Sequence, residues 1–255
     1  MIANYHTHTV RCNHAEGTER QYVENAIASG LKILGFSDHT PYIFPGEYYS
    51  RFRMKLNQLE DYVQSVLTLR KEFAGAIEIP LGLELEYYPN LLPRLLPVLR
   101  DLPIDYLLMG QHFIGDEIGE HYSGWETGDA QILERYVDQT IEGMYSGLFT
   151  YFAHPDLIHY VGDDKQYSHQ MRRLCQAAKG CDMPIEVNLL GLMEGRHYPN
   201  ALFWEQAAIE GCTVIMGRDA HSPKHLLDVA TEQRAMDLVK HFDLKLVDTV
   251  ELKKF

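Results

Sequence analysis

The sequence predicts an α/β protein with a mainly parallel sheet. Seven short runs rich in β-forming residues alternate with longer stretches of helical period along the 255 residues. Such alternation is typical of strands that are joined in parallel by helices. The composition does not change along the chain, and no linker, repeat or low-complexity segment interrupts it. We therefore expect one domain over residues 1–255.

The predicted strands are short apolar runs such as "KILGFS" and "CTVIMG". A final β-like run at 244–252 is expected to close or flank the sheet. The seven strands are expected at residues 2–6, 32–37, 79–85, 104–110, 148–153, 184–189 and 212–217.

The predicted helices lie between these strands. The stretch 18–30 opens with acidic residues and closes on Gly30, as the helix dipole and C-cap chemistry favour. The stretch 55–75 repeats apolar residues at spacings of three and four. Further helices are expected at 90–101, 129–147, 168–180, 200–211 and 223–241.

Two long loops, at 40–54 and 113–128, are expected to cover a site, because long ordered loops in α/β domains often do so. The first loop is rich in aromatic residues. These residues could contact a substrate or form the packed core of a lid, and the sequence leaves both possibilities open.

Composition and charge exclude several classes of protein. Hydrophobic content of 45% and charged content of 23% are typical of globular domains. A net charge of −13 argues against nucleic acid as the main partner, which would need a basic face. The chain shows no signal peptide, and no apolar run approaches the roughly 18 residues of a membrane span. The four cysteines are scattered, so we expect a cytoplasmic protein with reduced thiols and no membrane partner.

Each predicted strand ends in a polar or metal-competent side chain. His6 and His8 would point to the same side of an extended strand, as two ligands of one metal ion must. Two solvated histidines near a frayed terminus would give the same sequence pattern. In a closed β/α barrel all strand ends meet at one mouth, where barrel enzymes keep their active sites. The candidate metal ligands are His6, His8, His14, His39, Glu84, His112, His154, Asp219 and His221.

Nitrogen and carboxylate ligands of this kind suit Zn²⁺, Fe²⁺ or Mn²⁺. Nine candidates exceed the roughly four that one zinc ion takes, so two or three divalent ions are expected. Glu84 is the natural bridge, because its carboxylate offers two oxygens. Clustered ions generate hydroxide near neutral pH and clamp the attacking and leaving oxygens of a phosphate ester.

These motifs resemble the PHP (polymerase and histidinol phosphatase) family from residue 5 to about 224. The stretch "EVNLLGLMEGRHYPN" followed by "GRDAHSP" is similar to the monofunctional histidinol-phosphatase branch. The motifs are "HTH" at 6–8, His14, "SDH" at 37–39, "GLE" at 82–84, "QHF" at 111–113, "AHPD" at 153–156 and "DAHS" at 219–222. The resemblance implies a distorted seven-stranded (β/α)7 TIM-like barrel with a trinuclear metal centre. It also implies hydrolysis of L-histidinol phosphate to L-histidinol and phosphate, a step of histidine biosynthesis, through attack by a metal-bridging hydroxide.

The resemblance also implies roles for single residues. Glu84, Asp219 and His221 would be catalytic, and Arg196 matches a family position that meets the substrate phosphate. The first ion would be held by His6, His8, Glu84 and Asp219, and the remaining histidines would hold the others.

Two departures from the family pattern concern the substrate. Arg218 stands where relatives have a small residue; we expect a salt bridge directed away from the site, with a second phosphate contact as the alternative. Relatives often carry an arginine shortly after the strand-five histidine, where this chain has His159 and Tyr160. His159 and Tyr42 are therefore candidate substrate contacts, and Tyr42 could instead belong to the core of a lid.

Four carboxylates near the ligands have open roles. Asp38 and Asp156 are expected to orient imidazoles, with proton donation to the leaving group as the alternative. Glu86 and Glu186 could contact a substrate ammonium group or orient ligands. Two other functions remain possible: hydrolysis of another phosphomonoester, such as a phosphotyrosine protein or a nucleotide, and metal binding without turnover. No oligomeric state is predicted.

Overall fold

The computed structural model describes residues 1–119 and 121–255 and contains a seven-stranded sheet in which every neighbouring pair is parallel. The strand order is β11-β10-β9-β8-β5-β4-β3. These strands are β3 (Phe36–His39), β4 (Leu81–Leu85), β5 (Tyr106–Met109), β8 (Tyr151–Phe152), β9 (Ile185–Asn188), β10 (Thr213–Gly217) and β11 (Lys245–Leu246). The α/β class with a mainly parallel sheet is therefore confirmed.

The N-terminal segment lies between the two ends of this sheet. β1 (Ala3–Asn4) pairs with β2 (Ile33–Leu34), and the amide of Ser37 donates to the carbonyl of Thr7 at 2.8 Å. On the other side, the amide of His8 donates to the carbonyl of Ala220 at 3.0 Å. Thr7 and Ala220 form an isolated bridge, and β1 and β2 form a separate two-stranded sheet. The ladder among the described residues is therefore open, and the expected barrel is not confirmed as a continuous closed sheet.

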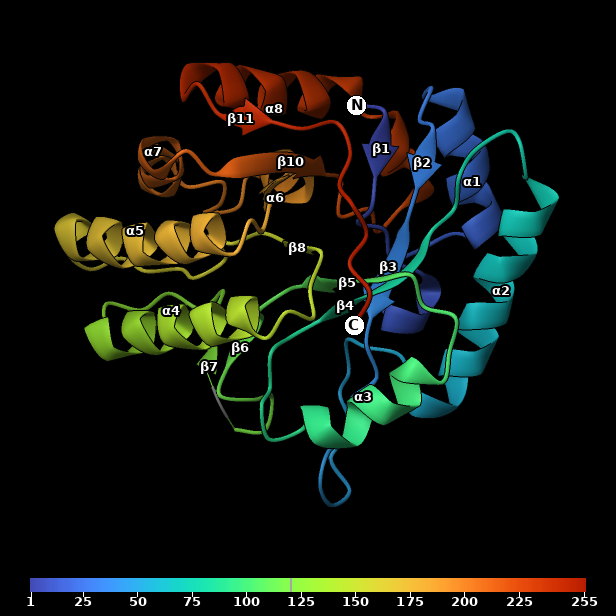
Figure 1. Cartoon of the computed structure of the whole chain (residues 1–255), viewed down its shortest axis with the longest axis horizontal. Coiled ribbons are helices and arrows are strands. Elements are labelled where there is room, and N and C mark those ends of the chain that lie inside the picture. Colours follow the sequence, from blue (N-terminus) through green and yellow to red (C-terminus); the bar gives the residue numbers. More distant parts are fainter. Residues whose placement is uncertain (120) are drawn as a thin grey trace.

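Helices surround the strands (Figure 1). They are α1 (Glu19–Ala28), α2 (Leu59–Glu72), α3 (Leu92–Arg100), α4 (Ala130–Tyr145), α5 (Asp164–Gly180), α6 (Leu189–Glu194), α7 (Ala201–Glu210) and α8 (Val229–His241). Short 3₁₀ helices lie at Val10–Cys12, Leu56–Gln58 and Pro223–Leu227. All seven expected helices are present.

The differences from the expected helices have local causes. α5 begins four residues earlier than expected, because Asp163 accepts a hydrogen bond from the amide of Gln166 and caps it. Asp228 caps α8 in the same way and separates it from the preceding 3₁₀ turn. α6 was not expected, and neither was the antiparallel hairpin of β6 (Phe113–Ile114) and β7 (His121–Tyr122) inside the second loop.

Two hydrophobic clusters hold the sheet. Leu107 and Met109 of β5 belong to the larger cluster, together with residues of the helices, and Tyr106 and Leu108 belong to the smaller cluster on the opposite face of the strand. In the smaller cluster the hydroxyl of Tyr106 donates to the carbonyls of Tyr5 and Phe36, at 2.7 and 3.0 Å. The C-terminal segment packs Val247, Val250 and Leu252 against this cluster. Apolar side chains thus fill the space near the amino ends of the strands, and the carboxyl ends carry the polar residues.

The β-like run expected at 244–252 flanks the sheet, as one of its two predicted roles, but its strand is only two residues long. Only Lys245 and Leu246 pair with β10, and the rest of the segment crosses the strands without pairing among the described residues. None of the helices in the described part of the chain is long and apolar enough to cross a membrane.

Candidate metal centre

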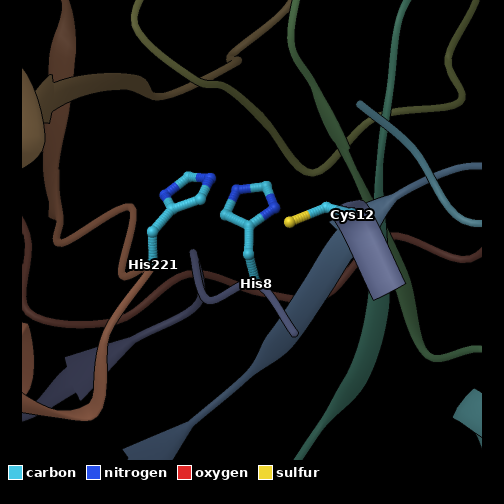
Figure 2. A group of neighbouring side chains, drawn as sticks. All are labelled: His8, Cys12 and His221. Atoms are coloured by element: carbon cyan, nitrogen blue, oxygen red, sulfur yellow. The ribbon is translucent and has the colours of Figure 1, made fainter. Parts of the chain in front are cut away.

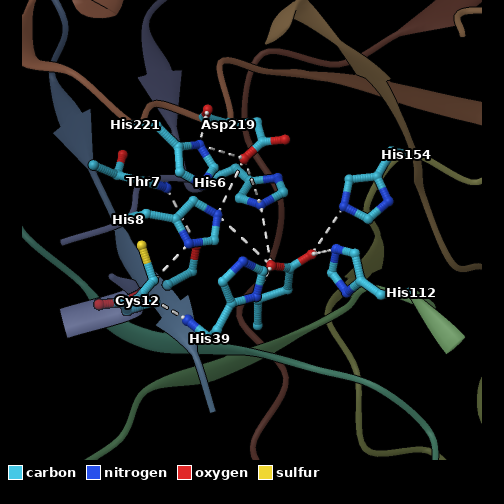
Figure 3. Close-up of polar contacts among 12 residues, drawn as sticks. His6, Thr7, His8, Cys12, His39, His112, His154, Asp219 and His221 are labelled. Carbon is cyan, nitrogen blue, oxygen red and sulfur yellow. Dashed lines mark hydrogen bonds and ion pairs between the residues drawn. The ribbon is translucent and has the colours of Figure 1, made fainter. Parts of the chain in front are cut away.

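The nine predicted ligands meet at the carboxyl ends of the strands (Figure 3). His39 ends β3, Glu84 lies in β4, and the other seven lie in the segments that follow β1, β5, β8 and β10. Groups of three with ligand atoms within 4.8 Å of one another include His6, Glu84 and His154, and His14, His39 and His221. The structure therefore brings the nine side chains together, and their binding of metal stays a prediction.

Glu84 lies at the centre of this cluster, with an exposed fraction of 1%. Its Oε1 is 2.9 Å from Nε2 of His154 and 3.6 Å from Nε2 of His112. Its Oε2 is 2.9 Å from Nδ1 of His39 and 3.6 Å from Nε2 of His8. The two oxygens thus face two different sets of imidazoles, which is the arrangement that a bridging carboxylate needs.

Asp219 faces the other side of the same histidines. Its Oδ1 is 3.4 Å from Nε2 of His6 and 3.1 Å from Nε2 of His8. Burial alone would raise the pKa of Glu84 and of Asp219, but the surrounding imidazoles hold both pKa values well below their usual ranges. Both carboxylates are therefore ionised ligands at neutral pH.

Three imidazoles are oriented by carboxylates behind them. Nδ1 of His6 lies 2.9 Å from Glu186, and Nδ1 of His112 lies 2.9 Å from Glu86. Nδ1 of His8 lies 3.4 Å from Asp38. A carboxylate acceptor holds the proton on Nδ1, so the lone pair of Nε2 points into the cluster.

The facing lone pairs require a cation. His14 donates its Nδ1 proton to the carbonyl of Cys12, and His221 donates its Nδ1 proton to the carbonyl of Asp219. Burial lowers the pKa of both rings, so both are neutral near pH 7. Their Nε2 atoms, each with a lone pair, nevertheless lie only 3.0 Å apart. This contact is repulsive unless a proton or a metal ion lies between the rings.

The unsatisfied polar atoms of the cluster fit divalent ions. Buried atoms without a hydrogen-bond partner in the described part of the chain include Nε2 of His6 and His8, Nδ1 of His39, Oε2 of Glu84 and Oδ1 of Asp219. Uncompensated buried groups of this kind are strongly destabilising. Their nitrogen and oxygen chemistry suits Zn²⁺ and similar ions. The residues therefore form clusters that can bind divalent metal.

Backbone features make room for these side chains. A Cβ atom at Gly110 would overlap Oε1 of Glu84, and one at Gly217 would overlap Oε1 of Glu186. His154 and Asp219 adopt positive φ angles of 33° and 48°, which non-glycine residues rarely do. Such strain, about 1–3 kcal/mol per residue, persists where the surroundings hold a side chain in a required direction.

Cys12 lies close to the cluster (Figure 2). Its sulfur can reach ligand atoms of His8 and His221, and Figure 2 shows it directed at the ring of His8. Burial raises the pKa of the thiol far above its usual value, mainly through desolvation. The thiolate is the species that binds metal, so the protonated thiol makes Cys12 a weaker candidate ligand than the histidines.

A cavity of about 430 Å³ opens onto the cluster. Seven of the candidate ligands line one side of it. Phe52, Phe113 and Tyr122 form an aromatic wall, in which the rings of Phe52 and Phe113 stack with centroids 5.8 Å apart. Arg196 also lines the cavity, with its guanidinium bonded to Tyr198 and Glu194. This volume and lining suit a small aromatic anion.

The structure does not support two of the predicted substrate contacts. Tyr42 is buried, donates its hydroxyl to the carbonyl of Glu86, and packs on Tyr88 with ring centroids 4.9 Å apart. It therefore belongs to the core of the loop. His159 stacks on His197 with centroids 4.0 Å apart, outside the residues described as lining the cavity.

Other open roles are resolved by contacts. Arg218 points away from the cluster, as preferred; its guanidinium is 3% exposed and contacts Glu232 and two carbonyls. Glu86 and Glu186 orient histidines rather than facing the cavity. Asp156 accepts from the amide of Asn200 at 2.6 Å, so it fixes the start of α7 instead of orienting an imidazole. Burial raises its pKa to about 7.

Sequence reasoning missed several residues of the site. Phe52, Phe113, Tyr122 and Tyr198 line the cavity, and Arg53 is buried beneath the first loop. The alternation "SRFRMK" in that loop was a signal, because an arginine between apolar residues often has a buried carboxylate partner.

Comparison with known proteins identifies the family. The family model described as PHP domain matches residues 4–189. The chain belongs to the PHP family. A protein named "probable histidinol-phosphatase" from Deinococcus radiodurans is 30% identical over 237 residues, which cover 87% of each chain. A histidinol-phosphatase from Lactococcus lactis is 32% identical over 123 residues, which cover 48% of this chain and 43% of that protein. These PHP relatives support a phosphatase.

The fold agrees with this family. A crystal structure of histidinol phosphate phosphatase from Lactococcus lactis, complexed with zinc, L-histidinol and phosphate, matches with a TM-score of 0.76 at 21% identity. The match covers 98% of this chain and 96% of that one. A crystal structure described as a "putative histidinol phosphatase" from Listeria monocytogenes matches with a TM-score of 0.74 at 17% identity, over 90% of this chain and 99% of that one. At these identities the likeness concerns the fold.

Proposed function

We propose that this PHP protein hydrolyses L-histidinol phosphate to L-histidinol and phosphate. The observation that supports this most is the convergence of imidazole lone pairs and two ionised carboxylates beside a cavity with an aromatic wall. The similarity to histidinol-phosphatases supports the choice of substrate. Divalent ions in this cluster would lower the pKa of a bound water and neutralise charge on the phosphoryl oxygens.

Separate groups of residues would bind the cations, the phosphate and the imidazole ring of the substrate. Glu84, Asp219 and His221 would hold the cations in place, and the two oxygens of Glu84 face two sets of histidines. Arg196 binds the phosphate from the cavity side, where its rigid position against Tyr198 favours a fixed geometry. The wall of Phe52, Phe113 and Tyr122 stacks against the imidazole ring of the substrate.

A carboxylate at the cavity fits the cationic amine of this substrate. Glu194 lines the cavity and lies 2.6 Å from a guanidinium nitrogen of Arg196. The pair therefore presents one cation and one anion to the substrate. L-histidinol phosphate carries a phosphate and an ammonium group and can complement both charges.

We also propose that residues 1–255 form one domain and that residues 5–8 complete a distorted seven-stranded barrel. The support is that this segment hydrogen-bonds to Ser37 on one side and Ala220 on the other. A barrel places all strand ends around one mouth, and the convergence of the nine side chains supports this arrangement.

The test is a comparison of kcat/KM for three phosphomonoesters after loading with Zn²⁺, Fe²⁺ or Mn²⁺. We expect kcat/KM for L-histidinol phosphate to exceed kcat/KM for a phosphotyrosine peptide and for a nucleoside monophosphate by at least about 100-fold. Only L-histidinol phosphate complements both the aromatic wall and the charges of Arg196 and Glu194. Equal or higher values for another ester would reject the substrate. Failure of the metal-loaded protein to hydrolyse even p-nitrophenyl phosphate would leave metal binding without turnover.

A further inference from the structure

A buried arginine ties the two long loops together beneath the cavity. Arg53, in the loop 40–54, is 1% exposed. Its Nε donates to Oε2 of Glu117 at 3.0 Å, and Glu117 belongs to the other loop. Oε1 of Glu117 accepts from the hydroxyl of Tyr48 at 2.9 Å, which adds a second contact between the loops. The two loops therefore share one buried carboxylate.

The same guanidinium donates hydrogen bonds to both carboxylate oxygens of Glu86. Nη2 of Arg53 donates to Oε1 of Glu86 at 2.9 Å, and Nη1 donates to Oε2 at 3.1 Å. Nη1 also donates to the carbonyl of Thr40 at 3.0 Å. Burial alone would lower the pKa of Arg53, but Glu86 and Glu117 outweigh it and raise that pKa. The planar guanidinium has five N–H donors and can bond to Glu86, Glu117 and the carbonyl of Thr40 at the same time, whereas the single ammonium of a lysine could make only some of these bonds.

Glu86 connects Arg53 to His112, one of the candidate metal ligands. Its Oε1 accepts from Arg53 and also lies 2.9 Å from Nδ1 of His112. Nε2 of His112 in turn lies 3.6 Å from Oε1 of Glu84. A continuous series of charged contacts therefore runs from both loops to the central carboxylate of the cluster.

Arg53 also supports the aromatic wall. Its guanidinium carbon lies 4.4 Å from the ring centroid of Phe52, within the range of a cation–π contact. Phe52 stacks on Phe113, which begins the hairpin of the second loop. The arginine thus contacts both the wall that faces the substrate and the carboxylate that orients a ligand.

We propose that Arg53 is a positioning residue that couples the packing of both loops to the metal-binding orientation of His112. The proposal deepens the proposed function and rests on it, because it takes His112 as a metal ligand. Without the guanidinium, Glu86 and Glu117 would be two buried carboxylates that repel each other. The loops would separate, and the ring of His112 would lose its fixed acceptor geometry.

The test compares R53M with R70M as the matched control. Arg70 also bridges a carbonyl and a carboxylate, those of Ile79 and Asp105. It lies at the amino ends of β4 and β5, whereas the candidate metal centre lies at the carboxyl ends of the strands. Metal affinity is measured by competition with a chromophoric chelator, and loop order by amide hydrogen exchange. For R53M we expect the affinity of the most weakly held ion to fall about 10- to 100-fold, as is typical when the partner of a ligand is lost. Exchange should rise in both loops.

Three further variants separate positioning from simple destabilisation. R53K keeps one cation and should restore part of the lost affinity. E86Q should weaken metal binding while the second loop stays tied through Glu117. E117Q should raise the hydrogen-exchange rate of the second loop relative to the wild type by a larger factor than it changes the Kd for metal. If R53M fails to fold, the comparison of R53K with these two variants carries the same test.

Metal affinity and loop exchange in R53M equal to those of the wild type and R70M would overturn the proposal. This outcome is distinct from failure of the proposed function. A wild-type protein that binds no metal or hydrolyses no phosphomonoester would reject the function, whereas an active wild type with an unaltered R53M would reject only the role of Arg53.

Discussion

Replacement of Glu84 by glutamine should lower metal content and turnover together. The substitution keeps the size of the side chain and removes the charge that both sets of histidines face. The carboxylate lies 3.6 Å from Nε2 of His8 and of His112, and a cation bound between these atoms would lie closer still. At this distance and an effective dielectric of about 20, each unit of cation charge interacts with the carboxylate by about 5 kcal/mol.

A glutamine oxygen recovers part of this energy for a divalent ion. We therefore expect a loss of about 3 kcal/mol or more in ion binding, which is a factor of about 100 or more in Kd. Metal content would be measured by mass spectrometry after dialysis against a weak chelator, and turnover would be measured on the same samples. The matched control is E78Q, the same substitution at an exposed site at the amino end of β4.

The reasoning has a clear point of failure. An E84Q protein that keeps its metal content after dialysis, or keeps full activity when its metal is gone, would show that Glu84 does not bridge the ions. Far-ultraviolet circular dichroism would establish that the variant is folded, so that a loss of metal is not mistaken for a loss of structure.

Three other changes have defined outcomes. G110A should reduce metal content and turnover as E84Q does, because a methyl group at Gly110 occupies the place of the Glu84 carboxylate; a normally loaded G110A would contradict this. E232Q should lower the free energy of unfolding by about 2 kcal/mol in urea titrations, because it leaves the buried guanidinium of Arg218 without its carboxylate; a change below about 0.5 kcal/mol would argue against it. Removal of metal by a chelator should lower the Tm by several degrees in calorimetry, since ions that bind only the folded state stabilise it; an unchanged Tm would mean that the folded cluster holds no ions.

The periodic parts of the fold were predictable because their signals are local. Strands and helices alternate with distinct periods, and caps such as Gly30 mark their ends. α6 is six residues long, and its cap, Asn188, is the last residue of β9, so no helical period could develop. The proposed closure of the sheet rests on the single bridge of Thr7 with Ala220, and residues 5–8 carry no signal beyond that of an ordinary strand.

The ligands of the centre were predictable for a different reason. Histidine and carboxylate side chains are conspicuous at strand ends, and parallel strands bring those ends together. The cavity wall and Arg53 depend instead on how two loops pack against each other. Loop packing follows long-range contacts such as Arg53 with Glu117, which join residues 64 positions apart. For the same reason the sequence left Tyr42 open between a ligand contact and a loop core, and the structure places it in the core.

The most direct test of the central claim is X-ray diffraction from crystals of the zinc-loaded protein, with anomalous data collected on both sides of the zinc absorption edge. We predict at least two anomalous peaks within about 2.3 Å of the ligand atoms of Glu84, Asp219 and the histidines around them. Peaks confined to the protein surface, with these side chains coordinating nothing, would contradict the account.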